Sequence, residues 1–317
     1  MEMDVLATGY PSIDAIARVS HSPTVGETAL VQAVPDRETF GGCGANIAVA
    51  LARLGFRAGV AMIIGDDPPG ERYMDYLASE GVDTANVVRL PGQQTSRSFL
   101  FLNPEGQHQN FFFPGAADAW DGELSLVDPG RYRFAAVTVG PFRYNRQFVR
   151  QIAEAGVPLV WELKPDVHAY PPEMLGAFLA ASAVVIMNHI EASYLLESLG
   201  YQAIEQLLSD TTHTVIVTQG AAGSRVTTAA GTSAVPAVPS RAIVDPTGAG
   251  DAFTAGFLAG LVRGASPETG ARLGAVVASF VLEATGCQTN LPTWEQAQAR
   301  YEQHFETFPS APMNEGA

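Results

Sequence analysis

The chain has 317 residues, of which 47% are apolar and 16% charged, as in soluble globular proteins of one large or two modest domains. Acidic residues outnumber basic ones 33 to 18 without any basic run, which argues against nucleic-acid binding because that depends on many phosphate contacts. No apolar run reaches the roughly 18 residues of a membrane span, and the N-terminus lacks a signal-like segment, so we expect a cytoplasmic protein without a membrane partner.

Two segments near the N-terminal third read as strands and turns without a helix. They are residues 14–33 and residues 95–113, the second being a hairpin whose turn is expected at 103–106. We predict that both form a small β-sheet that covers a site as a lid. The three phenylalanines at 111–113 either stack on a ring-shaped ligand or pack the lid against itself or a partner chain.

Elsewhere, short β-branched runs alternate with helical patterns, which predicts a mostly parallel sheet covered by helices on both faces. Strands are expected at 135–140, 157–163, 183–188 and 213–220, with helices between them such as 146–156 and 190–200. We assign residues 1–13, 34–94 and 114–308 to this α/β domain and expect a disordered tail at 309–317. Ligands of such sheets bind beyond the carboxyl ends of the strands.

The sequence "IVDPTGAGDAF" combines a glycine-rich turn with an acid. We predict a strand at 241–245, a turn at 246–250, and a helix from about Asp251. The N–H groups of Gly248, Ala249, Gly250 and Asp251 would then point out of a helix N-terminus, which binds anions through its unpaired donors and partial positive charge.

Asp251 has two interpretations. An acid in the first turn of a helix is commonly a favourable partner of the helix dipole. A carboxylate beside an anion-binding turn would repel the anion, however, unless it faces a hydroxyl group that attacks the anion. Asp251 would then be the general base, and the N–H groups of the turn would hold the charge of the transferring group. This interpretation predicts phosphoryl transfer.

The composition excludes several other sites. Lys164 is the only lysine, so neither a P-loop nor a protein-kinase lysine is present. Cys43 and Cys287 form no CxxC pair, and the six histidines lack metal-ligand spacing, which argues against a disulfide framework or a zinc site. The first strand is not followed by GxGxxG, which argues against a dehydrogenase.

The sequence resembles the ribokinase (PfkB) family of ATP-dependent sugar and nucleoside kinases. Residues 245–257, "DPTGAGDAFTAGF", and residues 41–55, "GGCGANIAVALARLG", are similar to the two long motifs of that family. The sequences "NHIEA" and "VTQGAAGS" match two shorter ones. Within the family, residues 110–117 and 278–294 resemble the archaeal-type nucleoside kinases. The resemblance implies a ribokinase-like three-layer α/β/α sandwich with a β lid, and phosphorylation of a nucleoside 5′-hydroxyl group.

The resemblance also implies roles on the acceptor side. Asp251 would be the catalytic base, and Gly248, Ala249 and Gly250 would form the anion hole. Asp14 would bind sugar hydroxyls together with Gly42 and Asn46, although Asp14 could instead end a strand and Asn46 could cap a helix. On the lid we name four further substrate-binding candidates, which are Arg97, Gln109, Phe111 and Phe113.

On the nucleotide side, the resemblance implies that ATP lies along Asn188, Thr218, Gly220 and Gly223, with Gly248 and Gly250 at its phosphates. Glu191 would hold Mg²⁺ through water molecules, although an ordinary helix start also explains an acid there. The residues that resemble a monovalent-cation loop pair are Asp245, Thr247, Gly286 and Cys287, and the use of K⁺ stays open. The lid strands of such kinases pair between subunits, so a homodimer is one expectation.

The sequence departs from the family pattern at two places, and two alternatives to a nucleoside kinase stay open. Position 246 is proline where many family members have threonine, and residues 161–171 match no family pattern, so Lys164 either approaches phosphate or forms a surface ion pair. The alternative substrate is a sugar such as ribose, fructose or a sugar phosphate. The scarcity of basic residues near the lid favours a neutral acceptor. The alternative from another class is a non-catalytic ligand-binding regulator, although such proteins commonly lose the base or the glycine turn.

Overall fold

A nine-stranded sheet forms the centre of the main domain in the computed structural model, which describes residues 2–33, 39–105, 108–164 and 170–309. Its strand order is β14-β13-β12-β11-β10-β9-β1-β5-β6, parallel from β12 to β6 and antiparallel between β12, β13 and β14. The strands are β1 (Met3–Thr8), β5 (Ala58–Gly65), β6 (Asp83–Leu90), β9 (Tyr132–Val137), β10 (Leu159–Glu162), β11 (Val184–Asn188), β12 (Thr214–Thr218), β13 (Ser224–Thr228) and β14 (Gly231–Val235).

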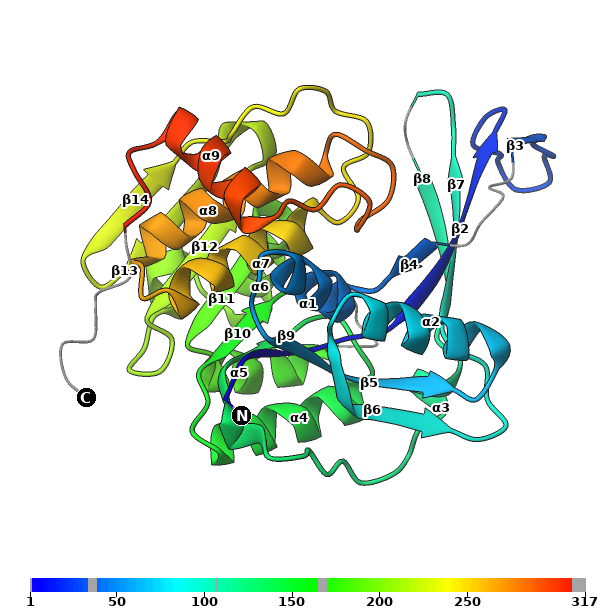
Figure 1. Ribbon diagram of the computed structural model, residues 1–317, viewed down its shortest axis with the longest axis horizontal. Coiled ribbons are helices and arrows are strands. Elements are labelled where there is room, and N and C mark those ends of the chain that lie inside the picture. The colour runs from blue at the N-terminus through cyan, green and yellow to red at the C-terminus, as the bar shows by residue number, and fades with distance from the viewer. Residues whose placement is uncertain (1, 34–38, 106–107, 165–169, 310–317) are drawn as a thin grey trace.

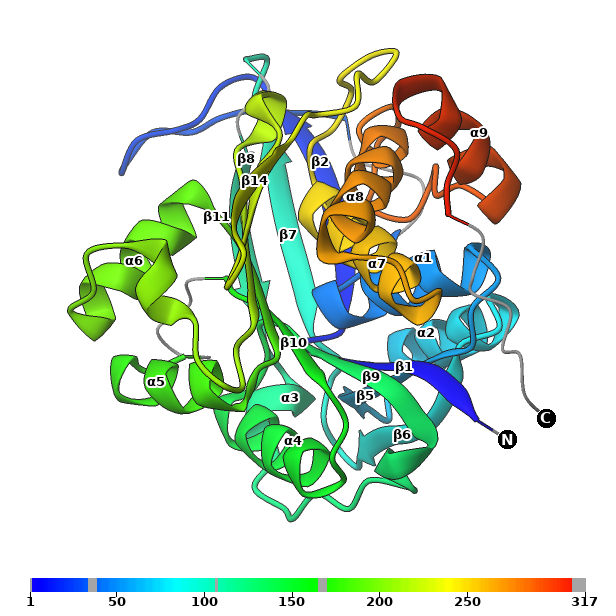
Figure 2. The same ribbon diagram turned by 90° about the vertical axis from the view of Figure 1, so that its left-hand side faces the viewer.

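Helices cover both faces of this sheet, as Figure 2 shows. One layer contains α1 (Cys43–Arg53), α2 (Pro68–Ser79), α7 (Ala249–Val262), α8 (Pro267–Val281) and α9 (Trp294–His304). The other contains α3 (Ala116–Ala119), α4 (Phe142–Glu154), α5 (Pro172–Ala181) and α6 (His189–Leu199). Short 3₁₀ turns occupy η1 (Pro129–Arg131), η2 (Ile204–Leu207) and η3 (Gly220–Ala222). The predicted α/β/α layering is confirmed.

Two hydrophobic cores follow from the alternation of side chains along the strands. In β1, Val5 and Ala7 face the core under α1, α7 and α8, whereas Leu6 faces the core under α4 and α5. Helix α7 is buried on nearly all sides, which explains its continuous apolar sequence. No helix in the described ranges is long and apolar enough to span a bilayer.

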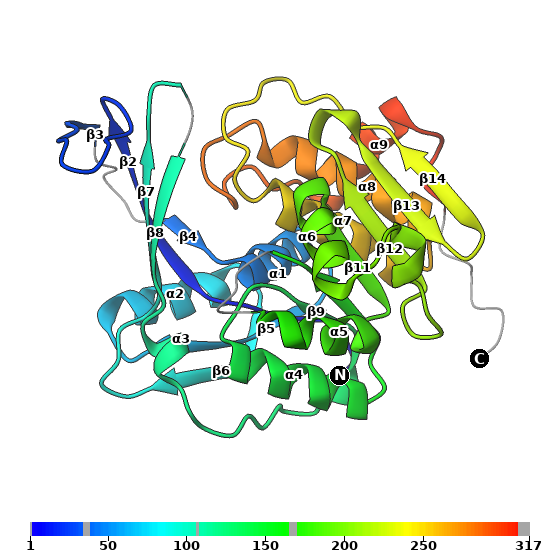
Figure 3. The same ribbon diagram turned by 180° about the vertical axis from the view of Figure 1, so that it is seen from behind.

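A second, small sheet stands away from the main domain (Figures 1 and 3). Its order is β3-β2-β7-β8, and β4 pairs with β2. The strands are β2 (Ser12–Val19), β3 (Val31–Ala33), β4 (Thr39–Gly41), β7 (Arg97–Leu102) and β8 (His108–Phe113). The predicted small sheet is therefore present, and it also takes in residues 39–41, which the sequence analysis placed in the main domain. Part of the predicted turn at 103–106 and nearly all of the tail at 309–317 lie outside the described residues.

The predicted strand at 241–245 is wrong. These residues have no strand conformation, and the sheet already ends at the β13–β14 hairpin. The Val244 N–H donates instead to the Leu282 carbonyl at 2.7 Å. Ile243 and Val244 are exposed, so their β-branched side chains indicate strand propensity without a strand partner.

Candidate active site

Helix α7 begins at Gly248 without a side-chain cap. Gly248 has φ of +79°, a conformation that side chains other than glycine disfavour, and a Cβ there would lie 2.6 Å from the Cys287 Cβ. In the described part of the chain, no acceptor takes a hydrogen bond from the N–H of Gly248, Gly250 or Asp251. The Ala249 N–H donates to the Pro246 carbonyl at 3.3 Å. Three of the four predicted anion-binding donors are thus available to a ligand.

Asp251 lies in the first turn of α7 and is only 2% exposed. The Asn46 side-chain amide donates to Oδ2 at 2.6 Å, and the Lys164 ammonium lies 2.7 Å from Oδ1. Burial raises the pKa of Asp251, but the Lys164 charge and the Asn46 hydrogen bond outweigh it and leave the pKa below its usual value. The carboxylate is therefore ionised at neutral pH, as a general base must be.

Asn46 is held in place by a chain of hydrogen bonds. The Gln288 amide donates to Asn46 Oδ1 at 2.6 Å, and the Tyr76 hydroxyl donates to Gln288 Oε1 at 2.6 Å. Because its oxygen accepts from Gln288, the Asn46 amide nitrogen must face Asp251. Asn46 is an interior residue of α1, which starts at Gly42 with φ of +97°. A Cβ on Gly42 would collide with the Tyr10 carbonyl, so the turn before α1 requires glycine.

Asp14, on β2, lies near this centre. The hydroxyl of Ser12 donates to its carboxylate, and the Ser12 and Ser98 hydroxyl oxygens lie 2.9 Å apart, so Ser12 accepts from Ser98. Burial and, to a smaller extent, the charge of Asp251 raise the pKa of Asp14 to about 6, against the effect of both serines. Asp14 and Asp251 therefore lie close enough to interact electrostatically. A buried acid and a partly buried one in the same region fit a site that binds hydroxyl groups.

The strand register divides the lid candidates between two faces. Asp14 lies opposite Ser98 on β7, and Ser98 lies opposite Phe112 on β8, so these three side chains share one face. Phe112 also packs edge-on against Tyr10, with ring centroids 4.9 Å apart. The four substrate-binding candidates named above, namely Arg97, Gln109, Phe111 and Phe113, occupy the opposite face.

This arrangement argues against direct substrate contact by those four side chains. Arg97 lies 3.7 Å from Asp67, which caps α2, and Phe111 packs against Phe101 on its own face. Phe112 and Ser98, which the sequence analysis did not single out, face the same side as Asp14. Period-two alternation predicts that neighbours in a strand point to opposite faces, but the side that faces Asp14 depends on the pairing of distant strands.

At the nucleotide side, Asn188 and Glu191 form a capping box at the start of α6. The Asn188 Oδ1 accepts from the N–H of Ile190 and of Glu191, and Glu191 Oε2 accepts from the Asn188 N–H at 2.6 Å. This local reason accounts for the Asn-x-x-Glu spacing without a ligand. Burial raises the pKa of Glu191, so the carboxylate is not fully compensated by its surroundings.

Thr218 and two glycines follow on the neighbouring strand. Thr218 ends β12 directly beside Asn188 in the register, so both stand at the carboxyl edge of the sheet. After it, Gly220 and Gly223 bound the η3 turn, which the Gln219 N–H closes by donating to the Gly223 carbonyl at 2.7 Å. The predicted nucleotide-binding residues therefore share one edge, as expected for a parallel sheet.

The predicted loop pair is also brought together. The Asp245 carboxylate accepts from the Thr247 N–H at 2.9 Å and from the Gly286 N–H at 3.0 Å. Cys287, next along the chain, lies against Gly248. Asp245 is 7% exposed, so these hydrogen bonds satisfy a buried carboxylate and tie the turn before α7 to the loop after α8.

Glu162 is a site residue that the sequence analysis missed. It ends β10, and its Oε1 lies 3.5 Å from the Lys164 ammonium. A Cβ on Gly250 would lie 3.3 Å from the same oxygen, so the carboxyl group packs against the first turn of α7. Its position at the carboxyl end of a strand, two residues before the only lysine, is the sequence signal that could have found it.

The donor set for a divalent cation is sparse. No cluster of three histidine, cysteine, aspartate or glutamate residues occurs in the ranges described above. Glu191 offers one carboxylate oxygen beyond its capping bond, which fits a magnesium ion held largely by water and phosphate rather than by protein. The residues are thus compatible with Mg²⁺ bound together with a nucleotide.

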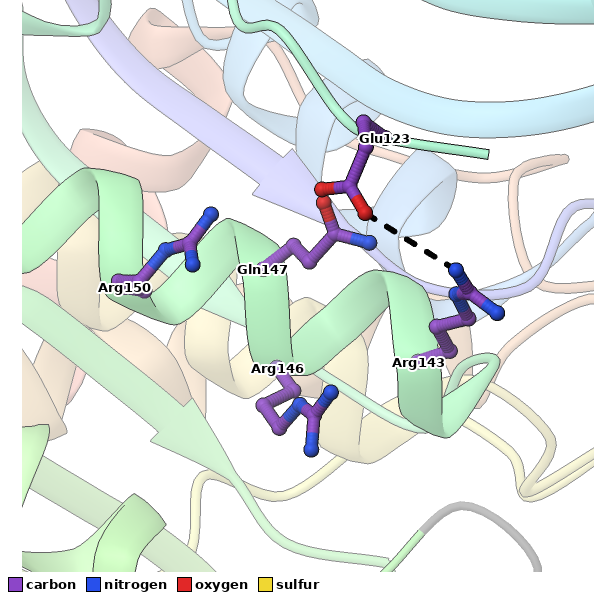
Figure 4. Close-up of a pocket in the computed structure, with 5 residues that line it drawn as sticks. All are labelled: Glu123, Arg143, Arg146, Gln147 and Arg150. Atoms are coloured by element: carbon purple, nitrogen blue, oxygen red, sulfur yellow. Dashed lines mark ion pairs between the residues drawn. The ribbon is translucent and has the colours of Figure 1, made fainter. Parts of the chain in front are cut away.

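A separate cavity of about 230 Å³ lies beside α4 (Figure 4). Arg143, Arg146, Gln147 and Arg150 line it from the helix, and Glu123 lies across from Arg143 at 3.9 Å. None of the site residues described above contributes to it. Its arginines lie on an exposed helix face with acidic or aromatic neighbours, so the cavity does not alter the assignment of the site.

Known proteins resemble the whole chain. The model of the pfkB family carbohydrate kinases matches residues 3–294. A nucleoside kinase of Methanocaldococcus jannaschii is 28% identical over 302 residues, covering 95% of this chain and 97% of that protein. The crystal structure of M. jannaschii nucleoside kinase, an archaeal member of the ribokinase family, has a TM-score of 0.87 and covers 96% of this chain and 99% of its own.

A second solved structure is similar over the same extent. The nucleoside kinase of Burkholderia thailandensis in complex with inosine is 26% identical, with a TM-score of 0.86, and the match covers 97% of this chain and 99% of that one. The predicted ribokinase-like fold is thereby confirmed. With an uncapped glycine turn, a buried aspartate beside it and a family match over nearly its whole length, the chain belongs to the pfkB family of carbohydrate kinases.

Proposed function

We propose that this chain is a nucleoside kinase that transfers the γ-phosphoryl group of ATP to the 5′-hydroxyl group of a nucleoside. The observation that carries the proposal is the buried, ionised Asp251 in the first turn of α7, beside N–H groups with no acceptor. The two nucleoside kinases that match nearly the full chain support a nucleoside over a free sugar.

For the chemical step, this chain supplies a base and an anion-binding turn. Asp251 takes the proton of the 5′-hydroxyl as the oxygen attacks the γ-phosphorus, and the bond to the ADP oxygen breaks with its electron pair staying on ADP. The N–H groups of Gly248, Gly250 and Asp251 stabilise the negative charge on the transferring group. Helix N-termini do this without a lysine side chain.

The acceptor lies between the main domain and the small sheet in this proposal. Asp14 accepts hydrogen bonds from ribose hydroxyls, with Asn46 and the backbone of Gly42 beside it. Phe112, exposed by 37% and packed on Tyr10, provides an aromatic surface for the base. Arg97, Gln109, Phe111 and Phe113 lie on the other face and stabilise the lid.

On the donor side, ATP lies along Asn188, Thr218, Gly220 and Gly223. Glu191 would hold Mg²⁺ through water, and the ion would supply positive charge to the ATP phosphates. The backbone near Thr247 and Gly286, which Asp245 joins, would hold a monovalent cation such as K⁺. Titrating activity with KCl against tetramethylammonium chloride tests that last assignment.

Assembly and location are further parts of the proposal. The outer face of the small sheet exposes Phe99, Phe111 and Phe113, which is an unfavourable surface for a monomer, so we propose a homodimer through this face. Light scattering on a size-exclusion column measures the mass directly. Both cysteines are free, in keeping with action in the cytoplasm.

The test is ATP consumption against adenosine, inosine, guanosine and cytidine, beside ribose, fructose and fructose 6-phosphate. The proposal predicts turnover on nucleosides with formation of the 5′-monophosphate. Turnover on free sugars alone would retain phosphoryl transfer and reject the nucleoside. ATP binding without turnover on any acceptor in the panel would reject the kinase assignment for these acceptors.

A further inference from the structure

Lys164 lies at the centre of a buried polar cluster beside the proposed base. Its ammonium nitrogen is 2.7 Å from Asp251 Oδ1, 3.5 Å from Glu162 Oε1 and 3.0 Å from the Cys43 sulfur. The four residues come from the start of α1, the end of β10 and the start of α7. Three chain segments thus converge on the only lysine of the protein.

Burial limits the charges that this cluster can hold. Side-chain exposure is 2% for Asp251 and 5% for Glu162, against 33% for Lys164. Two buried carboxylates beside a single cation would leave one negative charge uncompensated, which is unfavourable in a medium of low polarity. Burial and the charge of Asp251 accordingly raise the pKa of Glu162 to about 8, whereas the pKa of Asp251 is lowered. Glu162 carries the proton at neutral pH.

Each oxygen of Asp251 has its own fixed partner. The Asn46 amide donates to Oδ2 and the Lys164 ammonium to Oδ1, so the carboxylate plane is held from two sides. Glu162 Oε2, in contrast, is buried without any hydrogen-bond partner among the described residues. A protonated carboxyl group that packs against Gly250 is a neutral wall of the anion-binding turn.

We propose that Lys164 is a positioning residue of the phosphoryl transfer, which orients Asp251 and keeps it ionised. Glu162 lies beside the same base as an uncharged neighbour that adds no second negative charge. This inference rests on the proposed function. Among the described residues, two charged groups face Glu162. They are Lys164, two residues after the end of β10, and Asp251 on α7. Cys43, on α1, contacts Lys164.

The proton transfer makes this arrangement useful. Before the reaction, the pair of Asp251 and Lys164 is neutral. When Asp251 takes the hydroxyl proton, its negative charge disappears and the positive charge of Lys164 stays beside the newly formed phosphate ester. Lys164 thus holds the base ionised beforehand and balances the transferred charge afterwards.

The first test compares Lys164→Met with Lys164→Arg over pH 4 to 9, using a nucleoside that the parent enzyme phosphorylates. The range starts at pH 4 because the pKa of Asp251 lies below its usual value in the parent. We expect Lys164→Met to lower kcat roughly 10- to 100-fold at neutral pH, to change KM far less, and to move the acid limb of kcat upward by about one pH unit or more. Lys164→Arg should keep the acid limb near its parental place. A uniform loss without a moved limb would assign Lys164 a merely structural role and overturn the proposal.

Glu162→Gln tests the neutral carboxyl group. The parent should lose activity as the pH rises through about 8, where Glu162 ionises beside Asp251. Glutamine cannot ionise but still fills the space beside Gly250, so the variant should lose far less kcat at pH 7 than Asp251→Asn and should lack this alkaline decline. A loss at pH 7 as large as that of Asp251→Asn would show that the charge of Glu162 is needed, which contradicts the proposal.

A measurement without turnover separates this inference from the proposed function. Lys164 is the only lysine, so acylation by acetic anhydride, followed by mass spectrometry, reports on one side-chain amine, with the N-terminal amine as internal reference. Burial lowers the pKa of Lys164, but the charge of Asp251 outweighs it and raises the pKa well above its ordinary value. We expect acylation to accelerate about tenfold or more in Asp251→Asn. It should stay slow in the control Asp210→Asn, which changes an exposed acid outside the site. Equal rates in all three proteins would refute the ion pair even if no nucleoside is phosphorylated.

Discussion

Helices α6 and α7 both begin at the carboxyl edge of the sheet with an acid in their first turn, yet their N-termini differ. In α6, Asn188 and Glu191 satisfy the first N–H groups through a capping box. In α7, Gly248 offers no side chain, and Asp251 turns to Asn46 and Lys164 instead of back to its own helix. The first helix start is complete by itself, whereas the second has donors left for a ligand.

This difference indicates that the start of α7, and not the start of α6, carries the chemistry. Both sequences, "NHIEA" and "PTGAGDA", resemble family motifs, and an acid near a helix start fits both. Only at α7 does the aspartate combine deep burial with partners from two other chain segments. We therefore expect substitutions at α7 to act on turnover, and those at α6 to act on stability and metal use.

The largest effect is expected for Asp251→Asn. Asparagine fills the same space but cannot accept the proton, so kcat should fall roughly 10²- to 10⁴-fold. Asp210→Asn, at an exposed surface acid, is the matched control and should leave steady-state kinetics unchanged. Near-parental turnover of Asp251→Asn would remove the contrast between the two helix starts.

Next in size is Gly248→Ala. The added Cβ meets Cys287 and a left-handed backbone, so the turn must shift and the anion-binding donors with it. We expect kcat to fall on the order of 10- to 100-fold. Gly200→Ala is the control, because Gly200 ends α6 with φ of +70° but has no atom within 4 Å of an added Cβ. Gly200→Ala has only the strain of the left-handed backbone, so it should lower the free energy of unfolding by about 1 kcal/mol and leave turnover intact.

Asp14→Asn should act on the acceptor rather than on the chemical step. An amide replaces a carboxylate that accepts hydroxyl hydrogen bonds, so the KM of the nucleoside should rise on the order of tenfold or more. Because burial raises the pKa of Asp14 to about 6, its charged form is lost as the pH falls through 6. The parental KM should therefore rise below pH 6, and the KM of the variant should not follow. A parallel rise in both proteins would exclude Asp14 as the titrating group.

The smallest effects are expected at α6. Asn188→Ala removes the cap and should lower the free energy of unfolding by about 1 kcal/mol. Glu191→Gln keeps a capping partner but removes the charge, so it should leave the melting temperature nearly unchanged and raise the Mg²⁺ concentration needed for half-maximal activity. An unchanged Mg²⁺ requirement would leave Glu191 a purely structural role.

Local patterns predicted much of this molecule. The alternation of apolar strands and helices identified the layers, and the glycine turn at 246–250 identified the uncapped start of α7. The pairing of strands that are distant in sequence could not be predicted. Residues 241–245, with the β-branched Ile243 and Val244, lack a partner strand. The lid register that places Phe112 instead of Phe111 on the face of Asp14 depends on residues far apart in sequence.

In the active site, too, the local motif could be predicted and the contacts between distant segments could not. Asp251 follows from a motif of seven residues, because the glycines and the acid lie together in sequence. The neighbours that govern its charge, Glu162 and Lys164, lie about 90 positions earlier and meet it only through the crossover connections of the sheet. A single sequence predicts such convergence to one edge of the sheet, but not which side chains touch.

The most direct test of Asp251 as the general base is a single turnover of ATP and inosine, stopped by rapid quench, in the parent, Asp251→Asn and Asp210→Asn. The affinity of each protein for each substrate is measured separately by calorimetry. We predict that Asp251→Asn binds both substrates with near-parental affinity. It should form inosine 5′-monophosphate roughly 100-fold more slowly or worse, as expected for the loss of a general base. Formation of the monophosphate at the parental rate by Asp251→Asn would contradict the central claim that this carboxylate at the start of α7 activates the attacking hydroxyl.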